Sequence, residues 1–254
     1  MTKNEYANRI AELVGGKVVK TDKVNGIEYT GIVIPPNGTG VSPIFYIDGY
    51  YANGCSVLET VEMAKKFREQ HKDFSVDINW IRYYEKVKPH LHARLYNKAT
   101  KAEVFVSAEQ YGFEDLILVP YVTVGECASA KVTNKLLETW NVTKEELMQA
   151  AINNIQYRLF RMSDLLNYEW PFNDLMIIVT NPDRLCGASS IIKAHQALKE
   201  MFPYGYLVLP SSVHEVMVVP KEEASYDCCL EMVSEVNREC VDPEEWLSDN
   251  VYIF

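Results

Sequence analysis

The sequence predicts an α+β protein with mainly antiparallel sheets and helices packed on one face of them. Three observations predict this class. Several segments carry apolar residues at helical spacing, short β-prone runs lie between them, and the last third of the chain reads strand, helix, strand, strand, helix. The 254 residues, 48% of them hydrophobic and 24% charged, are enough to bury a substantial core.

The first elements are a helix and a small set of strands. Residues 4–14 are amphipathic, and Gly15 and Gly16 would end a helix there. Asn25-Gly26 is a strong hairpin-turn signal, and residues 35–40 are rich in turn formers. We expect strands at 17–21, 27–34 and 43–47.

The middle of the chain alternates helices and strands. Ser56 and Glu59 form a capping box that predicts a helix over 56–71. Strands are expected at 91–96 and 116–124, where Pro120 implies a bulge or an edge position. A second capping box starts at Thr143, and an apolar stripe stepping by four residues extends that helix through Leu159.

The C-terminal part is the clearest. We expect a buried strand at 175–180, a helix over 188–201, strands at 206–209 and 213–219, a helix over 226–240 and an edge strand at 251–254. Residues 164–174, rich in acids and aromatics around Trp170-Pro171, read as a connection. We therefore expect two closely associated lobes, 1–163 and 175–254, with one continuous domain as the alternative.

Composition excludes several classes of protein. A net charge of −10 makes direct nucleic-acid binding unfavourable, although a basic group occurs at Lys86, Lys88 and Arg94, with His90 and His92 between them. No apolar run is long enough to span a membrane, and six cysteines without C-x-x-C spacing fit reduced thiols in the cytoplasm. His90 and His92 would share one strand face, but no third ligand is evident, so we expect no metal and no cofactor.

Several runs resemble a family of uncharacterised bacterial proteins known as domain of unknown function 5688. They are VTNPDRLCGAS (179–189), YLVLPSSVHEVMVVP (206–220), EVNRECVDPEEWLSDNVYIF (235–254), WNVTKEEL (140–147) and FYIDGYY (45–51). A more distant resemblance runs to the uncharacterised family 1444. These resemblances supply no catalytic residues; the first implies an accessory role associated with mobile elements.

The candidate site residues fall into three groups. Ser211, Ser212, His214 and Glu215 lie within five residues, but on a strand His214 and Glu215 would face opposite ways, which argues against a serine-hydrolase triad. Turn closure by the serines is the structural alternative. The second group is a turn before a helix, with Asn181, Arg184 and Gly187. The third is a polar-aromatic pair, Asp48 and Tyr50.

Three functions remain open. The first is a non-enzymatic accessory factor that binds another protein, favoured by an acidic surface and sixteen tyrosines. The second is a hydrolase or transferase for a small anion, with His214 as base and Arg184 as anion holder at a helix N-terminus. The third is an acidic anti-defence protein that mimics nucleic acid.

Overall fold

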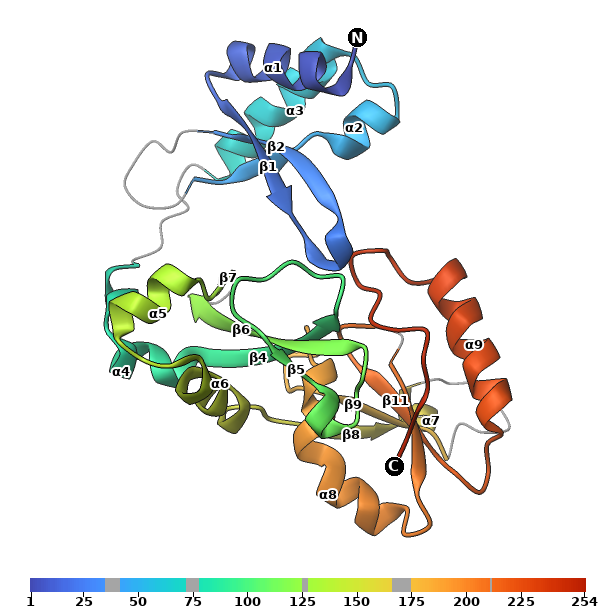
Figure 1. Cartoon of the computed structure of the whole chain (residues 1–254). Coiled ribbons are helices and arrows are strands. Elements are labelled where there is room, and N and C mark those ends of the chain that lie inside the picture. Colours follow the sequence, from blue (N-terminus) through green and yellow to red (C-terminus); the bar gives the residue numbers. More distant parts are fainter. Residues whose placement is uncertain (35–41, 72–77, 125–127, 166–174, 211) are drawn as a thin grey trace. The chain divides into compact units, whose positions relative to one another are not determined.

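The computed structural model describes residues 1–34, 42–71, 78–124, 128–165, 175–210 and 212–254 (Figure 1). The chain forms two compact units, Met1–Trp80 and Ile81–Phe254. All described strand pairs are antiparallel, and helices and strands occur in both units, so the α+β class is confirmed.

The first unit is a three-stranded sheet covered by helices. Helix α1 (Lys3–Val14) begins at a Thr2–Glu5 capping box and ends at Gly15, whose φ of 67° is left-handed. The sheet order is β1-β2-β3, and helices α2 and α3 follow it in the chain. The bounds are β1 Lys17–Asp22, β2 Glu28–Val33, β3 Ile44–Tyr46, α2 Asp48–Ala52 and α3 Val57–Gln70.

The core of this unit lies between the helices and one face of the sheet. Ile10 of α1, Ile32 of β2 and Val61 of α3 are almost fully buried in one cluster. The amphipathic pattern of residues 4–14 and the capping box at Ser56 therefore predicted both long helices correctly. The expected turn at 35–40 lies outside the described residues.

The first sheet of the second unit is built around β6 (Leu116–Val124). Strand β4 (Leu91–Asn97) pairs along one side of β6, and β5 (Val106–Ser107) and β7 (Ala128–Lys131) pair along the other. The prediction that Pro120 marks a bulge or an edge was wrong, because β6 is central. Pro120 instead falls between the residues that pair with β5 and with β7, where its missing N–H removes no ladder bond.

Short helices precede, connect and follow the strands of this sheet along the chain. They are the 3₁₀ turns η2 (Asn79–Arg82), η3 (Lys88–His90) and η4 (Glu109–Tyr111), with α4 (Tyr84–Val87), α5 (Asn134–Trp140) and α6 (Lys144–Asn153). The expected extension of the Thr143 helix through Leu159 was wrong, since α6 ends at Asn153. Leu159 lies in β8 (Arg158–Arg161), where it pairs with Val179.

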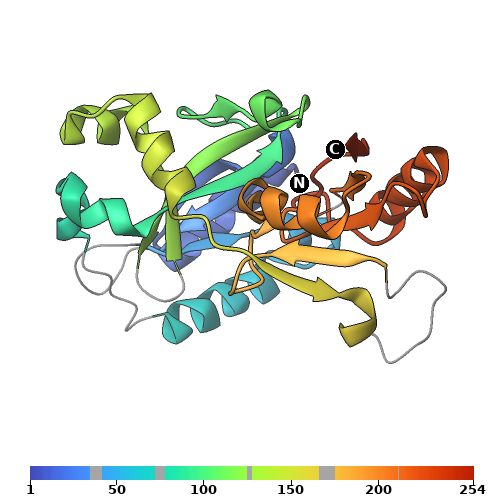
Figure 2. The same ribbon diagram turned by 90° about the horizontal axis from the view of Figure 1, so that it is seen from below.

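The second sheet has the order β12-β10-β11-β9-β8. Its other strands are β9 (Ile177–Thr180), β10 (Tyr206–Leu209), β11 (Val216–Pro220) and β12 (Tyr252–Ile253). Figures 1 and 2 show β8 beside β9, with α7 (Met162–Leu165) directly after β8. The strands before and after the expected connection at 164–174 thus belong to one sheet. The boundary between the two compact units falls instead between Trp80 and Ile81. Residues 166–174 themselves lie outside the described part.

Both faces of the second sheet contact a helix. Leu207 and Val219 pack with Val233 of α9 (Tyr226–Glu239). Tyr206, on the opposite face, bonds through its hydroxyl to His195 of α8 (Ile191–Met201), which follows the 3₁₀ turn η5 (Ala188–Ser190). The expected strand 213–219 starts only at Val216, because Ser212 bridges to Trp246 and its Oγ accepts the His214 N–H at 3.0 Å, which bends the chain.

A buried polar network joins the end of the chain to the first sheet of this unit. Ser248 donates its hydroxyl to Asp115 Oδ2 at 2.7 Å, and Tyr252 donates its hydroxyl to Asp115 Oδ1. The Asn250 N–H donates to Ser248 Oγ at 2.9 Å. Burial, with the Asp115 hydrogen bond adding to it, raises the pKa of Tyr252 well above its usual range. The LSDNVY run therefore has a structural role.

Candidate functional site

Asp48 and Tyr50 stabilise the first unit. Asp48 accepts the Thr30 N–H at 2.8 Å and forms an ion pair with Lys3, which fixes α2 against β2 and α1. The Tyr50 ring stacks on Phe45 with centroids 5.2 Å apart. The other candidate residues all belong to the second unit.

The turn after β9 is held by its own side chains. Asn181 Nδ2 donates to the Leu185 carbonyl at 2.9 Å, and the Leu185 N–H donates back to Asn181 Oδ1 at 3.1 Å. Arg184 and Cys186 have left-handed backbones, with φ of 54° and 51°. The structural interpretation of Asn181 as a turn residue is thus confirmed.

Gly187 packs where no side chain fits. A Cβ on Gly187 would lie 2.4 Å from Thr180 Oγ1, 2.5 Å from the Asn181 nitrogen and 2.8 Å from the His214 carbonyl oxygen. The Gly187 N–H donates to that same carbonyl at 2.9 Å, and the Thr180 hydroxyl donates to it at 2.8 Å. The turn after β9 is therefore fastened to the bend before β11.

Both ring nitrogens of His214 are engaged. Nδ1 accepts the Cys186 N–H at 3.1 Å, so in the neutral ring the proton is on Nε2, which lies 3.1 Å from Glu245 Oε1. The acid that orients this imidazole is Glu245 rather than Glu215. The strand-face argument fails here, because residues 213–215 precede β11. Burial raises the pKa of Glu215; nearby His214 opposes the rise and Glu245 adds to it.

Ser212 is buried and hydrogen-bonded to the backbone, as the turn-closing interpretation predicted. Ser211 lies outside the described residues. His214 thus holds the turn after β9, and Ser212 holds the bend before β11.

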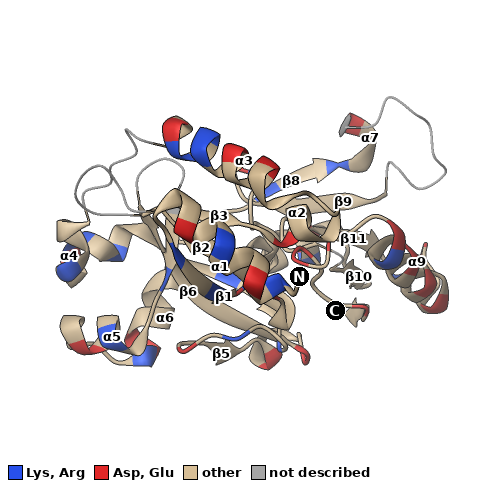
Figure 3. Cartoon of the chain, turned by 90° about the horizontal axis from the view of Figure 1, so that it is seen from above, with Lys and Arg blue, Asp and Glu red and all other residues tan. Residues whose placement is uncertain are grey.

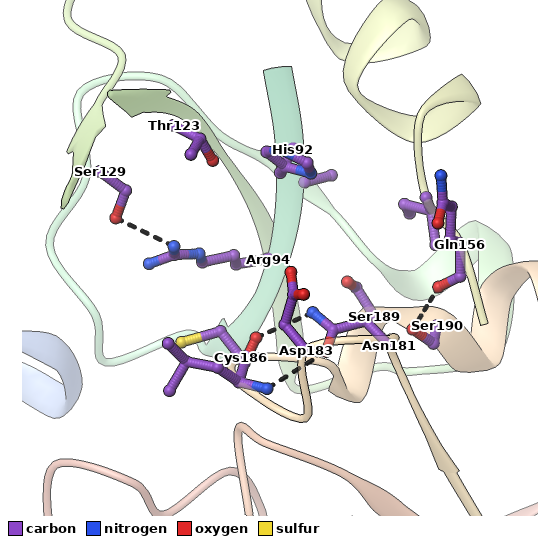
Figure 4. Close-up of a pocket in the computed structure, with 13 residues that line it drawn as sticks. His92, Arg94, Thr123, Ser129, Gln156, Asn181, Asp183, Cys186, Ser189 and Ser190 are labelled. Atoms are coloured by element: carbon purple, nitrogen blue, oxygen red, sulfur yellow. Dashed lines mark hydrogen bonds between the residues drawn. The ribbon is translucent and has the colours of Figure 1, made fainter. Parts of the chain in front are cut away.

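A polar cavity of about 200 Å³ opens beside this turn (Figure 4). It lies between the first sheet of the second unit and the loop that leads from β9 to α8. Its walls come from β4, β6, β7, the segment between α6 and β8, and that loop: His92, Ala93, Arg94, Thr123, Ser129, Ile155, Gln156, Asn181, Asp183, Leu185, Cys186, Ser189 and Ser190.

Arg94 provides the cation of this cavity. Its guanidinium lies 4.2 Å from the centroid of the Tyr121 ring and donates to Ser129 Oγ at 2.9 Å. Burial lowers the pKa of Arg94, but Cys186, Tyr96 and Tyr121 together outweigh this and leave it raised, so the side chain stays charged. Among the described residues no carboxylate forms an ion pair with it.

His92 and Asp183 stand on opposite walls. Desolvation lowers the pKa of His92, the Arg94 charge lowers it further, and Asp183 opposes the shift. A neutral imidazole is therefore favoured near neutral pH. In Figure 4 the Asp183 carboxylate points toward β4, on which His92 and Arg94 lie.

Arg184 is not part of the cavity wall. Its guanidinium lies 4.6 Å from the centroid of the Phe160 ring on β8. Asn181, Asp183 and Cys186 of the predicted turn line one cavity with Arg94. Arg94 was not among the candidate site residues predicted from the sequence. The basic group 86–94 was the sequence signal for Arg94, and the turn was the signal for Asp183.

No cluster of three or more histidine, cysteine or carboxylate side chains with metal-binding geometry occurs in the described ranges. Among these residues no helix is both long and apolar enough to cross a membrane.

Fold and cavity together define an α+β protein with an arginine-lined polar pocket at the edge of a sheet. The chain belongs to DUF5688, a family of unknown function whose model matches residues 2–254. The resemblance drawn from the C-terminal motifs is therefore confirmed. No curated protein matches the chain. No solved structure matches it either.

Proposed function

We propose that this protein binds a small anionic ligand in the cavity lined by Arg94. The observation that carries the proposal is a half-buried, permanently charged guanidinium that faces a polar cavity and has no carboxylate partner among the described residues. Removing a charge from water is unfavourable unless an opposite charge compensates it. A carboxylate or phosphate oxygen on the guanidinium would provide that compensation, since the planar fork matches both groups.

Other groups of the wall suit an anion. Helix α8 and the turn η5 begin at the cavity, so the positive end of the helix dipole points toward it. The Ser189 hydroxyl points into the cavity and makes no hydrogen bond within the described chain (Figure 4). The Ser190 hydroxyl, by contrast, already donates to the Gln156 carbonyl at 2.7 Å.

What supports binding over the hydrolase or transferase alternative is the state of His214. A general base needs a ring nitrogen that can reach the substrate. Nδ1 accepts the Cys186 N–H and Nε2 lies against Glu245, so the ring has no nitrogen available for a substrate. Arg184, the anion holder of that alternative, covers Phe160 instead.

Cys186 offers a direct test, because its thiol lines the same cavity as Arg94. Iodoacetate is an anion, whereas iodoacetamide is neutral. We expect the ratio of the iodoacetate rate to the iodoacetamide rate at Cys186 to be about tenfold larger in the wild type than in the Arg94→Gln variant. The thiolate fraction of Cys186 cancels in this ratio of two reagents at one thiol. Mass spectrometry of the alkylated peptides measures the ratio.

The matched control is Arg184→Gln. Arg184 lies in the same loop as Cys186, but it is not part of the cavity wall. Its reagent ratio should equal that of the wild type. A ratio that is the same in the wild type and in Arg94→Gln would contradict anion binding at this cavity. Thermal unfolding of each variant shows whether the fold is kept.

A protein partner is the second candidate function, favoured by the distribution of charge. Residues 215–254 hold eleven of the 35 acidic residues and two of the 25 Lys and Arg, so this segment accounts for −9 of the net −10. Asp227, Glu231 and Glu235 lie exposed at four-residue steps along α9, near the exposed side chains of Tyr226 and Met232. Figure 3 shows acidic residues recurring along α9, where Arg238 of the last turn is the one basic residue. Such a surface suits a basic protein partner, as an accessory factor or a nucleic-acid mimic would require.

Affinity capture from bacterial lysate tests this second candidate when the wild type is compared with a triple variant, Asp227→Asn, Glu231→Gln and Glu235→Gln. We expect the captured protein to be basic, to be lost with the triple variant and to be released by high salt. Release by added duplex DNA would support mimicry specifically. Equal capture by both chains would contradict a role for α9.

A further inference from the structure

The cavity contains a second, opposite charge that an anion alone does not explain. Asp183 and Arg94 both line it, yet the two side chains form no ion pair with each other, although the structure describes both. We propose that the ligand is a small zwitterion of the amino-acid class, with its carboxylate on Arg94 and its ammonium group on Asp183. This inference rests on the proposed function, and it names the class of ligand.

The charges of the lining side chains favour a zwitterionic ligand over a phosphate. Arg94 is the single Lys or Arg among the described residues that line the cavity. The lowered pKa of His92 favours its neutral form, so the imidazole contributes no second cation near neutral pH. A phosphate dianion would meet one positive charge and the repulsion of Asp183, whereas a zwitterion meets a partner for each of its charges.

The size of the cavity agrees with a small ligand. The space of about 200 Å³ has room for a small molecule. A short amino acid fits within this space.

The wall also offers contacts for the rest of such a ligand. Ile155 and Leu185 provide apolar surface, and Thr123 and Gln156 provide polar groups. A ligand with a short side chain could therefore contact both kinds of surface while its two charged groups remain on Arg94 and Asp183.

Protection of Cys186 from iodoacetamide provides the test, because the reagent is neutral and the thiol lies in the cavity wall. The competitors are alanine, propionate, ethylamine and inorganic phosphate at constant ionic strength. We expect alanine to protect Cys186 at about a tenth of the concentration that propionate needs, which corresponds to about 1.4 kcal/mol. The exposed thiols Cys228 and Cys240 report any change in the reagent itself.

Two variants assign the charges. In Asp183→Asn the advantage of alanine over propionate should disappear while propionate still protects, and in Arg94→Gln neither should protect. The control Asp164→Asn, at an exposed carboxylate of α7 outside the cavity wall, should behave like the wild type.

The failures of the two proposals are distinguishable. Equal or better protection by propionate or phosphate in the wild type would overturn the zwitterion and leave anion binding intact. Loss of alanine's advantage in Asp164→Asn would also overturn it, because a carboxylate outside the cavity wall would then explain the effect. Absence of any protection that depends on Arg94 would overturn both proposals.

Discussion

Replacing Gly187 with alanine is expected to destabilise the second unit by about 3 kcal/mol, because overpacking against fixed atoms is strongly unfavourable. The added Cβ would lie 2.5 Å from the Asn181 backbone nitrogen and 2.8 Å from the His214 carbonyl oxygen. Neither backbone atom can move without breaking the bonds that fasten the turn to the bend. The φ of Gly187 is −92°, so the effect is steric rather than conformational. Urea unfolding followed by circular dichroism measures it.

Gly49→Ala is the matched control. Gly49 lies in α2, and a Cβ there would meet no atom within 4 Å. Alanine favours a helix over glycine, so this variant should be as stable as the wild type or slightly more stable. If Gly187→Ala unfolded at the same urea concentration as Gly49→Ala, the close packing of the turn after β9 would be disproved.

The second large effect is expected at Asp115. Asp115→Ala removes the acceptor of two hydrogen bonds and leaves the hydroxyls of Ser248 and Tyr252 buried without it. The loss of two hydrogen bonds to a carboxylate, one of which leaves the buried Ser248 hydroxyl without its acceptor, should lower the free energy of unfolding by about 3 kcal/mol. Urea unfolding again provides the measurement.

Glu114→Ala is the control for Asp115, since its side chain is exposed at the neighbouring position. We expect a change of less than about 0.5 kcal/mol for it. Tyr252→Phe should fall between the two, because it removes one of the two donors to Asp115. An Asp115→Ala variant as stable as the Glu114→Ala variant would show that the network contributes nothing to stability.

Local signals in the sequence predicted most of the secondary structure. The capping box of Ser56 and Glu59 predicted the start of α3, and the β-prone run of residues 116–124 predicted the bounds of β6. Both signals act over a few residues. Leu159 misled the prediction because its four-residue step continued a stripe, whereas pairing with Val179 across the sheet fixed it in β8.

The candidate site depended on contacts that local patterns do not encode. Glu245 reaches His214 from 31 positions further along the chain, so the sequence could not identify this partner. Arg94 and Asp183 meet because β4 and the loop after β9 line one cavity, and no motif spacing specifies that meeting. The turn itself, including Asn181 and Gly187, was visible in the sequence as a turn.

The position of Arg184 affects how this protein behaves at high concentration. β8 is an outer strand of its sheet, and Arg184 covers the ring of Phe160 on it, while the exposed Arg158 and Arg161 stand at the two ends of that strand. The opposite outer strand, β12, has only two residues. Charged or very short borders discourage the addition of a strand from another chain. The two outer strands of the second sheet therefore disfavour β-aggregation at the high protein concentrations that measurements of weak ligand binding require.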